Sequence, residues 1–231
     1  MSSDSVSAVL VHGAWADGSS WSKVIDRLAA RGIRAIAAPL PLTSLDDDVA
    51  ALERTLERIE GPVVLAGHAY AGAVIGSTRA ANVRALVYVA ALAPDEGETA
   101  GDVFYRGETH PQAPKLAPDS HGLIWLPEDA FAQAFAQNAT LQELTVLAAV
   151  QRPIAVASIG KAVARPLWKD LPSWFLVAGQ DRMINPDTQH FTASRMKASV
   201  RSFDVDHTPS VTAPDAATDI IVEAVQSVST R

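Results

Sequence analysis

The sequence predicts an α/β fold: a three-layer sandwich whose central sheet is mostly parallel and has about six strands. Short apolar runs rich in β-branched residues alternate with longer segments whose apolar residues recur at helical spacing. This alternation is typical of βαβ units, which place helices on both faces of a parallel sheet. With 231 residues, 48% of them hydrophobic and 19% charged, the chain can bury the core that such a fold needs.

The amino-terminal part contains two predicted strands, each followed by a predicted helix. The strands are the apolar runs at residues 8–11 and 33–38. Apolar residues on one face predict the first helix over residues 21–29, with Ser19 or Ser20 as its cap.

The second helix is predicted to begin after Ser44, with an apolar stripe that continues to Ile59. Three acidic residues, 46–48, lie in its first turn, where the helix dipole favours negative charge. We interpret them as a charge complement to the helix rather than as a metal site.

A third strand, residues 63–66, leads into the segment Gly67-His68-Ala69-Tyr70-Ala71-Gly72 and then into a short helical run. This strand–turn–helix context is the one in which the G-x-S-x-G nucleophile elbow occurs. Position 69, where the serine would stand, holds alanine. Because alanine has no lone pair to attack a carbonyl carbon, an acyl-enzyme at this position is impossible.

The regular alternation is interrupted after the fourth predicted strand, residues 85–90. Residues 94–170 are rich in proline, glycine and aromatic residues, with a helical stretch over residues 127–150. We interpret 94–170 as a helical cap inserted into a single domain of residues 1–231. The final part is expected to hold strands at 174–178 and 200–204, followed by a helix over 214–228.

Four candidate site positions follow strands of the predicted sheet. Ala14 follows the first, Ala69 the third, Asp181 the strand at 174–178, and His207 the strand at 200–204. Since ligands of an open parallel sheet bind beyond the carboxyl ends of its strands, these residues are expected to meet there. Along the chain, the nucleophile position comes first, the acid second and the histidine third. Two other residues are candidates for the acid: Asp95, which follows the fourth strand, and Asp206, whose side chain should point away from His207.

Four motifs carry a family resemblance: residues 12–21 (HGAWADGSSW), 64–68 (VLAGH), 86–91 (LVYVAA) and 181–184 (DRMI). They resemble a bacterial α/β-hydrolase family related to plant hydroxynitrile lyases and methyl esterases, and the likeness covers nearly the whole chain. The resemblance implies an oxyanion hole formed by the N–H groups of Ala14 and Tyr70, with Asp181 orienting the general base His207.

The elbow of that family reads G-H-S-Y-G-G, so this chain departs from it at Ala69 and Ala71. Two explanations are open: a change in the natural lineage, or deliberate replacement of the serine. Ala71 favours the natural change, because its methyl group is expected where the elbow helix packs closely on its strand.

The resemblance favours an esterase-like hydrolase for small apolar or aromatic carbonyl compounds, inactive or of low activity without its serine. One alternative is an enzyme in which His207 and Asp181 act without a serine, as a lyase or a cofactor-free oxygenase. Another is a binding protein without catalysis. Trp15, His68 and Trp125 are the candidate substrate-binding residues, although His68 is also readily explained as a packed elbow residue.

Composition excludes several other classes of protein function. A net charge of −7 gives no basic footprint for nucleic acid, and the absence of cysteine excludes thiolate catalysis and disulfides. No histidine spacing suggests a metal site, and we expect no cofactor. Met1 to Ser7 show no features of a signal peptide, and no apolar run could cross a membrane. We therefore expect a cytoplasmic protein, monomeric or homodimeric, that binds a small molecule.

Overall fold

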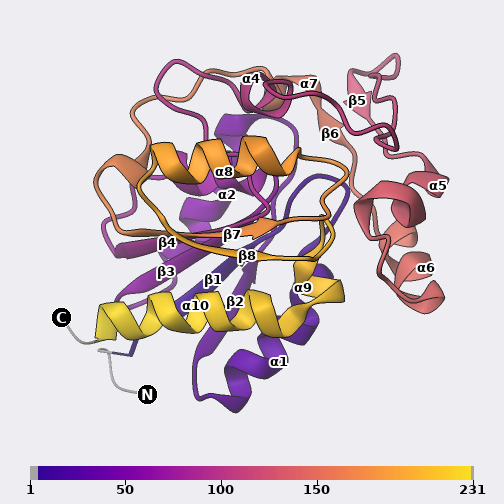
Figure 1. Cartoon of the computed structure of the whole chain (residues 1–231). Coiled ribbons are helices and arrows are strands. Elements are labelled where there is room, and N and C mark those ends of the chain that lie inside the picture. Colours follow the sequence, from indigo (N-terminus) through magenta and orange to yellow (C-terminus); the bar gives the residue numbers. More distant parts are fainter. Residues whose placement is uncertain (1–4, 230–231) are drawn as a thin grey trace.

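The computed structural model describes residues 5–229, and these contain one six-stranded sheet with helices on both faces (Figure 1). The strand order is β2-β1-β3-β4-β7-β8, and every pair is parallel. The strands are β1 Ser7–Val11, β2 Arg34–Ala38, β3 Val63–His68, β4 Val83–Val89, β7 Ser173–Ala178 and β8 Ser199–Phe203. The predicted α/β class and its parallel sheet are confirmed. Residues 1–4, part of the segment on which the signal-peptide expectation rests, lie outside the described residues.

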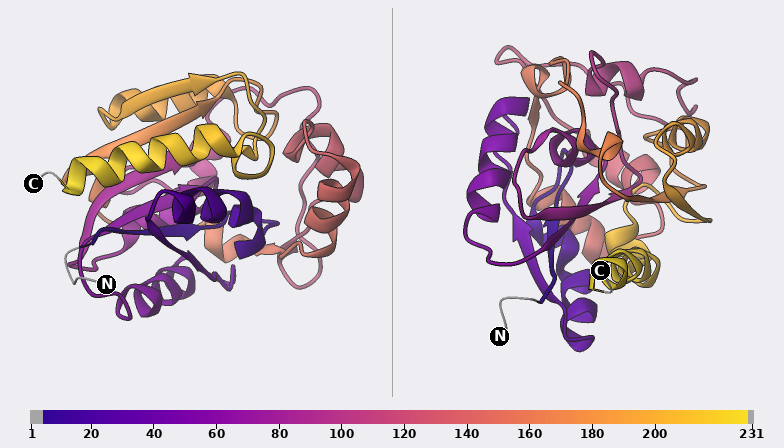
Figure 2. Two further views of the ribbon diagram at one scale, coloured as in Figure 1. Left: turned by 90° about the horizontal axis from the view of Figure 1, so that it is seen from below. Right: turned by 90° about the vertical axis from the view of Figure 1, so that its left-hand side faces the viewer.

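Two helical layers cover the sheet. Alternate residues of each strand face opposite sides, so Val63 and Leu65 join one apolar cluster and Val64 joins the other. Figure 2 shows the layers in two further views. The helices over the first cluster are α2 Leu45–Leu56, α3 Ala71–Ser77 and α8 Pro186–Arg195, and those over the second are α1 Ser22–Ala30 and α10 Pro214–Ser229.

The two predicted helix caps have different outcomes. Ser44 caps α2 as expected, its hydroxyl accepting the Asp47 N–H at 3.1 Å. At the first helix the prediction of Ser19 or Ser20 is wrong. A 3-10 turn, η1 (Gly18–Trp21), precedes α1, and the carboxylate of Asp17 caps it by accepting the Ser19 N–H at 2.8 Å. Aspartate thus takes the capping role one turn earlier.

Most of the segment between β4 and β7, residues 94–170, lies beyond the carboxyl ends of the strands, and its last part runs back to the start of β7 (Figure 1). The helix expected over residues 127–150 is interrupted, because Thr140 and Glu143 form a capping box that begins a new helix. The elements of this inserted segment are α4 Ala100–Phe104, β5 Leu123–Ile124, α5 Glu128–Ala130, the π-helix η2 Phe131–Phe135, α6 Leu141–Ala149, β6 Ile154–Ala155, α7 Val156–Ile159 and η3 Leu167–Lys169. β5 and β6 pair antiparallel.

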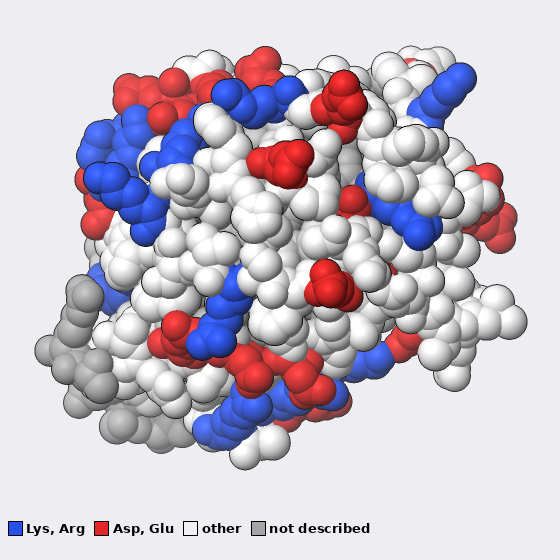
Figure 3. Space-filling view, viewed as in Figure 1, with Lys and Arg blue, Asp and Glu red and all other residues white. Residues whose placement is uncertain are grey.

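Acidic and basic side chains are interspersed on the face shown in Figure 3, rather than gathered into a field of one sign. Some of them pair across neighbouring helices: Arg27 of α1 meets Asp215 of α10 at 2.6 Å. Exposed pairs of this kind add little stability. Among residues 5–229, no helix combines the length and the apolar character needed to cross a lipid bilayer.

Candidate active site

An apolar cavity lies at the carboxyl ends of β1 and β3, between the sheet and the inserted segment. Its wall is made almost entirely of aliphatic and aromatic side chains, and the imidazole of His207 also faces the cavity. The lining residues are Ala14, Trp15, Ala69, Tyr70, Leu92, Ala100, Gly101, Phe104, Tyr105, Leu116, Ile124, Ile154, Ile159, Met183, Ile184 and His207. The cavity therefore brings Ala14 and His207 together with Ala69 and Tyr70, from three distant parts of the sequence.

Ala69 stands on a sharp turn between β3 and α3. Its backbone has φ +50°, in the left-handed region that residues with a Cβ rarely adopt. The turn is held on both sides, since Ala69 N–H donates to the Val89 carbonyl at 3.2 Å and the Ala69 carbonyl accepts the Leu92 N–H at 3.0 Å. Strained turns of this kind present the side chain of the elbow residue above the sheet.

The elbow packs closely on its surroundings at Gly67 and Gly72, and Gly67 faces the backbone of Ala71. A Cβ on Gly72 would lie 2.3 Å from the Leu92 carbonyl oxygen, and one on Gly67 would lie 2.9 Å from the Ala71 carbonyl oxygen. The methyl group of Ala71 packs inside the apolar cluster. That the change at position 69 arose in the natural lineage stays a prediction from the sequence.

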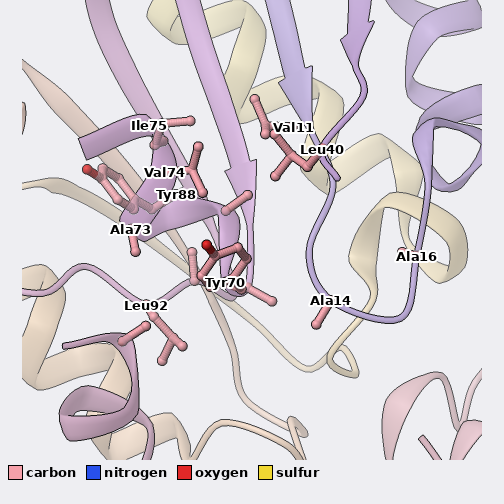
Figure 4. Packing of buried hydrophobic residues seen from close by; sticks show 14 of the residues in the cluster. Val11, Ala14, Ala16, Leu40, Tyr70, Ala73, Val74, Ile75, Tyr88 and Leu92 are labelled. Carbon is pink, nitrogen blue, oxygen red and sulfur yellow. The ribbon is translucent and has the colours of Figure 1, made fainter. Parts of the chain in front are cut away.

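Two backbone N–H groups beside Ala69 have no protein partner. Ala14 lies on the loop after β1 and Tyr70 at the start of α3 (Figure 4), and both line the cavity. Within residues 5–229, neither N–H donates to a protein acceptor. Buried N–H groups are nearly always paired, so two unpaired ones at one cavity are suited to bind an oxygen atom of a ligand.

The loop that carries Ala14 is fixed by its neighbour Trp15. Trp15 has φ +58°, and its backbone N–H donates to the Arg152 carbonyl at 3.0 Å. Its indole N–H donates to the carbonyl of Ile124, at 2.9 Å. The predicted substrate-binding residue Trp15 therefore lines the cavity and also ties the loop to the inserted segment.

His207 and Asp181 form a buried pair. His207 Nδ1–H donates to Asp181 Oδ2 at 2.8 Å, and the two side chains are at most 2% exposed. With the proton on Nδ1, the neutral ring has its lone pair on Nε2, as a general base requires. The other oxygen of Asp181 accepts the N–H groups of Met183 at 2.7 Å and Ile184 at 2.9 Å.

Gln189 of α8 completes the surroundings of Asp181. Its amide group donates to Asp181 Oδ2 at 2.8 Å and to the Ile184 carbonyl at 2.9 Å. Its own oxygen accepts the Ala178 N–H at 3.0 Å. All three contacts hold the acid at the end of β7. The sequence gives no signal for this role, because a glutamine inside a polar helical stretch is not marked by any pattern.

Asp48 is a second buried polar residue whose place near the site was not predicted. It is fully buried, and its carboxylate accepts the Tyr70 hydroxyl at 2.7 Å and the Leu42 N–H at 2.6 Å. Burial raises the pKa of Asp48 to about 6, against the effect of the Tyr70 and Leu42 hydrogen bonds. Asp48 lies in the first turn of α2, as expected for a charge complement to the helix, but unlike Asp46 and Asp47 it is buried. Its spacing from Leu45 and Leu52 places it on the buried stripe of α2, which was the available signal.

His68 packs beneath the pair rather than in the cavity wall. Its Nε2–H donates to the His207 carbonyl at 2.7 Å, and Nδ1 has no partner among the described residues. Burial, followed by the nearby His207, lowers the pKa of His68 to about 3, so its ring is neutral. The structure thus places His68 as a packed elbow residue, the alternative to its expected role in substrate binding.

Trp125, the third expected substrate-binding residue, lies outside the cavity. It is 49% exposed, and its indole N–H donates to Asp119 at 3.2 Å. The physical reason is strand alternation: Trp125 directly follows β5, so its neighbour Ile124 points inward and lines the cavity.

The two rival acids also face elsewhere. Asp95 pairs with Lys169 at 2.5 Å, at the surface. Asp206 is buried, and its oxygens accept the N–H groups of Asn138 at 2.9 Å and Thr208 at 3.1 Å. Among the candidate acids, Asp181 is the one bonded to His207.

Comparisons with known proteins agree with this architecture. A family model described as "Alpha/beta hydrolase family" matches residues 8–220. No curated protein matches the chain significantly.

Solved structures share the fold along their whole length. A pyrethroid hydrolase from Sphingobium faniae JZ-2 superposes with a TM-score of 0.81 at 19% identity, covering 96% of this chain and 98% of that chain. Polyneuridine aldehyde esterase gives 0.77 at 17% identity, with 95% and 98% covered. The methylesterase MES16 from Arabidopsis gives 0.79 at 16% identity, with 96% and 99% covered.

Proposed function

The chain belongs to the alpha/beta hydrolase family, and from this premise we propose that its cavity is the site of an esterase-like hydrolase whose nucleophile position holds Ala69. One observation carries the proposal. The buried His207–Asp181 pair and the unpaired N–H groups of Ala14 and Tyr70 surround the same apolar cavity as Ala69. The printed names of the structural neighbours, which are esterases and hydrolases, support the same class of reaction.

Each group has a role in acyl transfer from an ester. A hydroxyl at position 69 would attack the carbonyl carbon while His207 Nε2 takes its proton. The N–H groups of Ala14 and Tyr70 would stabilise the negative oxygen of the tetrahedral intermediate. His207 would then pass the proton to the leaving alkoxide, with Asp181 stabilising the charged imidazole. Water would release the acid in a second round of the same steps.

With Ala69 in place, the first of these steps has no nucleophile. Loss of the nucleophile from a triad costs on the order of 10⁶-fold in kcat, while the oxyanion site and binding retain some advantage over water. The chain as it stands is therefore proposed to bind its ligand and to turn over esters very slowly, if at all.

The cavity favours a neutral, apolar substrate. None of its lining residues is Asp, Glu, Lys or Arg, so a charged group would lose its hydration without gaining a partner. Small esters with an aliphatic or aromatic body fit this lining. We also assign residues 94–170 the role of a cap, because Leu116, Ile124, Ile154 and Ile159 of that segment form part of the wall.

A second function is favoured by the intact pair itself. His207 and Asp181 stay buried and hydrogen-bonded in front of a residue that cannot react. In this alternative, His207 abstracts a proton from the substrate, or from a water molecule in the space beside Ala69, without a covalent intermediate. The oxyanion site would hold the resulting enolate, phenolate or tetrahedral oxygen.

Restoring the hydroxyl tests the proposal. In the Ala69→Ser variant we expect hydrolysis of p-nitrophenyl butyrate with a kcat at least 10³-fold above that of the original chain. Adding His207→Ala should abolish the gain, because no base then remains.

Other outcomes separate the alternatives. Turnover by the original chain that disappears in His207→Ala would support the nucleophile-free enzyme. A folded Ala69→Ser variant that hydrolyses no neutral ester would refute the esterase-like proposal.

A further inference from the structure

Asp48 is a buried carboxylate for which acyl transfer provides no role. Its two oxygens each accept one hydrogen bond, from Tyr70 OH at 2.7 Å and from the Leu42 N–H at 2.6 Å. The hydroxyl of Ser158, itself fully buried, lies beside the same carboxyl. A carboxylate removed from water costs free energy even when paired, so its presence calls for a compensating function.

Each partner of Asp48 belongs to a segment that shapes the cavity. Tyr70 carries one of the two unpaired N–H groups. Leu42 has φ +60°, and its carbonyl accepts the Ala155 N–H at 2.9 Å, which joins the loop after β2 to β6. Ser158 lies on α7, whose last residue, Ile159, lines the cavity. One carboxylate thus connects the elbow with two parts of its surroundings.

Packing alone does not explain the choice of aspartate. Position 48 lies on the apolar stripe of α2, between the buried residues Leu45 and Leu52. An apolar residue of similar volume would fill such a place without the cost of desolvation. A phenylalanine would likewise supply the ring of Tyr70. The hydroxyl and the carboxylate are needed only if the bond between them matters.

We propose that Asp48 is a positioning residue of this site: through the Tyr70 hydroxyl it fixes the residue whose N–H binds the oxyanion. Through the Leu42 N–H, it also holds the loop that bonds to β6, and Ile154 of β6 forms part of the cavity wall. The inference rests on the proposed function, since it assigns Tyr70 N–H to the developing negative charge. Whether Asp48 holds the elbow rigid can be measured without any turnover.

Four variants test it, each combined with Ala69→Ser in the full chain. Asp48→Ala removes the acceptor of the hydrogen bond between Tyr70 and Asp48, and Tyr70→Phe removes its donor. Asp48→Asn keeps both contacts, because its oxygen can accept from Leu42 N–H while its amide donates to the Tyr70 hydroxyl. Asp46→Ala is the control: Asp46 lies in the same helical turn, is 71% exposed and pairs with Lys161.

For hydrolysis of p-nitrophenyl butyrate, we expect Asp48→Ala and Tyr70→Phe to lower kcat by roughly tenfold or more with KM within about twofold. This is a part of the 10²- to 10³-fold that loss of a whole oxyanion donor costs. Asp48→Asn and Asp46→Ala should stay within about twofold of the Ala69→Ser parent. The double variant Asp48→Ala/Tyr70→Phe should be no slower than the slower single variant, because both remove one interaction.

Hydrogen exchange gives a second readout that is independent of activity. In the original Ala69 background, Asp48→Ala and Tyr70→Phe should speed deuterium uptake in the peptide covering residues 66–77, and the two other variants should not. If the Ala69→Ser parent is inactive, the proposed function fails and this exchange decides on Asp48 alone. If Asp48→Ala does not fold, Tyr70→Phe decides, since it deletes a single hydroxyl. Unchanged kcat and unchanged exchange in folded Tyr70→Phe would overturn the proposal, as would equal kcat losses in Asp46→Ala and Asp48→Ala.

Discussion

Ala69 and Trp15, which line the cavity, and Leu42, whose carbonyl bonds to β6, all adopt left-handed backbone conformations. Each such residue costs on the order of 1–3 kcal/mol and persists only where its surroundings hold it. Here the holding groups are visible: Val89 and Leu92 for Ala69, Asp48 for Leu42. The strained turn at position 69 is thus kept although its side chain is inert. At the residue scale, the site is defined by the groups that fix the reacting positions as much as by the reacting groups.

Gln189 gives a prediction at this scale. Gln189→Leu leaves the Ala178 N–H and the Ile184 carbonyl without their partner and removes one donor from Asp181. We expect the free energy of unfolding to fall by about 2–4 kcal/mol, since each unpaired buried group costs about 1–3 kcal/mol. Urea denaturation measures it. His190→Leu, a change at the exposed neighbour, should alter stability by less than about 0.5 kcal/mol; a similar loss in both variants would refute the assigned role.

At the scale of elements, the inserted segment is tied to the loop that carries His207. The Thr208 hydroxyl donates to the Phe135 carbonyl at 2.5 Å, and Asp206 accepts the Asn138 N–H. The ring of Phe135 packs against His207 at an interplanar angle of 58°, with 5.4 Å between ring centres. The end of η2 and the histidine loop thus form one hydrogen-bonded unit. This connection couples the placement of the base to the placement of the cavity wall.

Asp206→Ala should loosen that connection. The change removes the acceptor of Asn138 N–H, Thr208 N–H and the Thr212 hydroxyl. We expect a loss of about 3 kcal/mol, from roughly 1 kcal/mol for each hydrogen bond, and faster deuterium uptake over residues 131–140. Asp204→Ala, at an exposed position two residues earlier, is the control. Normal protection of residues 131–140 in Asp206→Ala would contradict the coupling.

At the scale of the whole molecule, two buried groups make stability depend on pH in opposite directions. Burial lowers the pKa of His68 to about 3. As the pH drops below about 6.5, His68 binds a proton in the unfolded chain but not in the folded one, so the free energy of unfolding falls. Burial raises the pKa of Asp48 from its usual 3.8 to about 6. Between these values the folded state holds a proton that the unfolded state has released, so this contribution to stability falls as the pH rises.

The Asp48→Asn variant isolates the second effect, because asparagine does not titrate. The unfolding free energy of the original chain minus that of the variant should decrease between about pH 4 and pH 6.5. The total change should be about 2–3 kcal/mol, at 1.36 kcal/mol for each unit of pKa shift. Urea titrations of both proteins across this range measure it. A difference that is constant with pH would show that Asp48 has an ordinary pKa in the folded state.

Much of this architecture follows from local patterns. The strands were predictable because parallel strands buried on both faces read as continuous apolar runs, as at residues 63–66. The meeting of Asp181 with His207 followed from their place after neighbouring parallel strands. Contacts made by helices and by the inserted segment were harder to predict. The burial of Asp48 was hard to predict because it is one of three consecutive acidic residues at the start of α2. The outward direction of Trp125 depends on the two-residue strand β5, which the sequence does not indicate.

The central claim is that this site lacks its nucleophile and keeps the groups that would activate one. Labelling with a fluorophosphonate measures this most directly, because the reagent phosphonylates a serine only when a base and an oxyanion site activate it. We expect intact-mass spectrometry to find one adduct on the Ala69→Ser chain, at position 69, and none on the original chain or on Ala69→Ser/His207→Ala. A folded Ala69→Ser chain that remains unlabelled would contradict the claim.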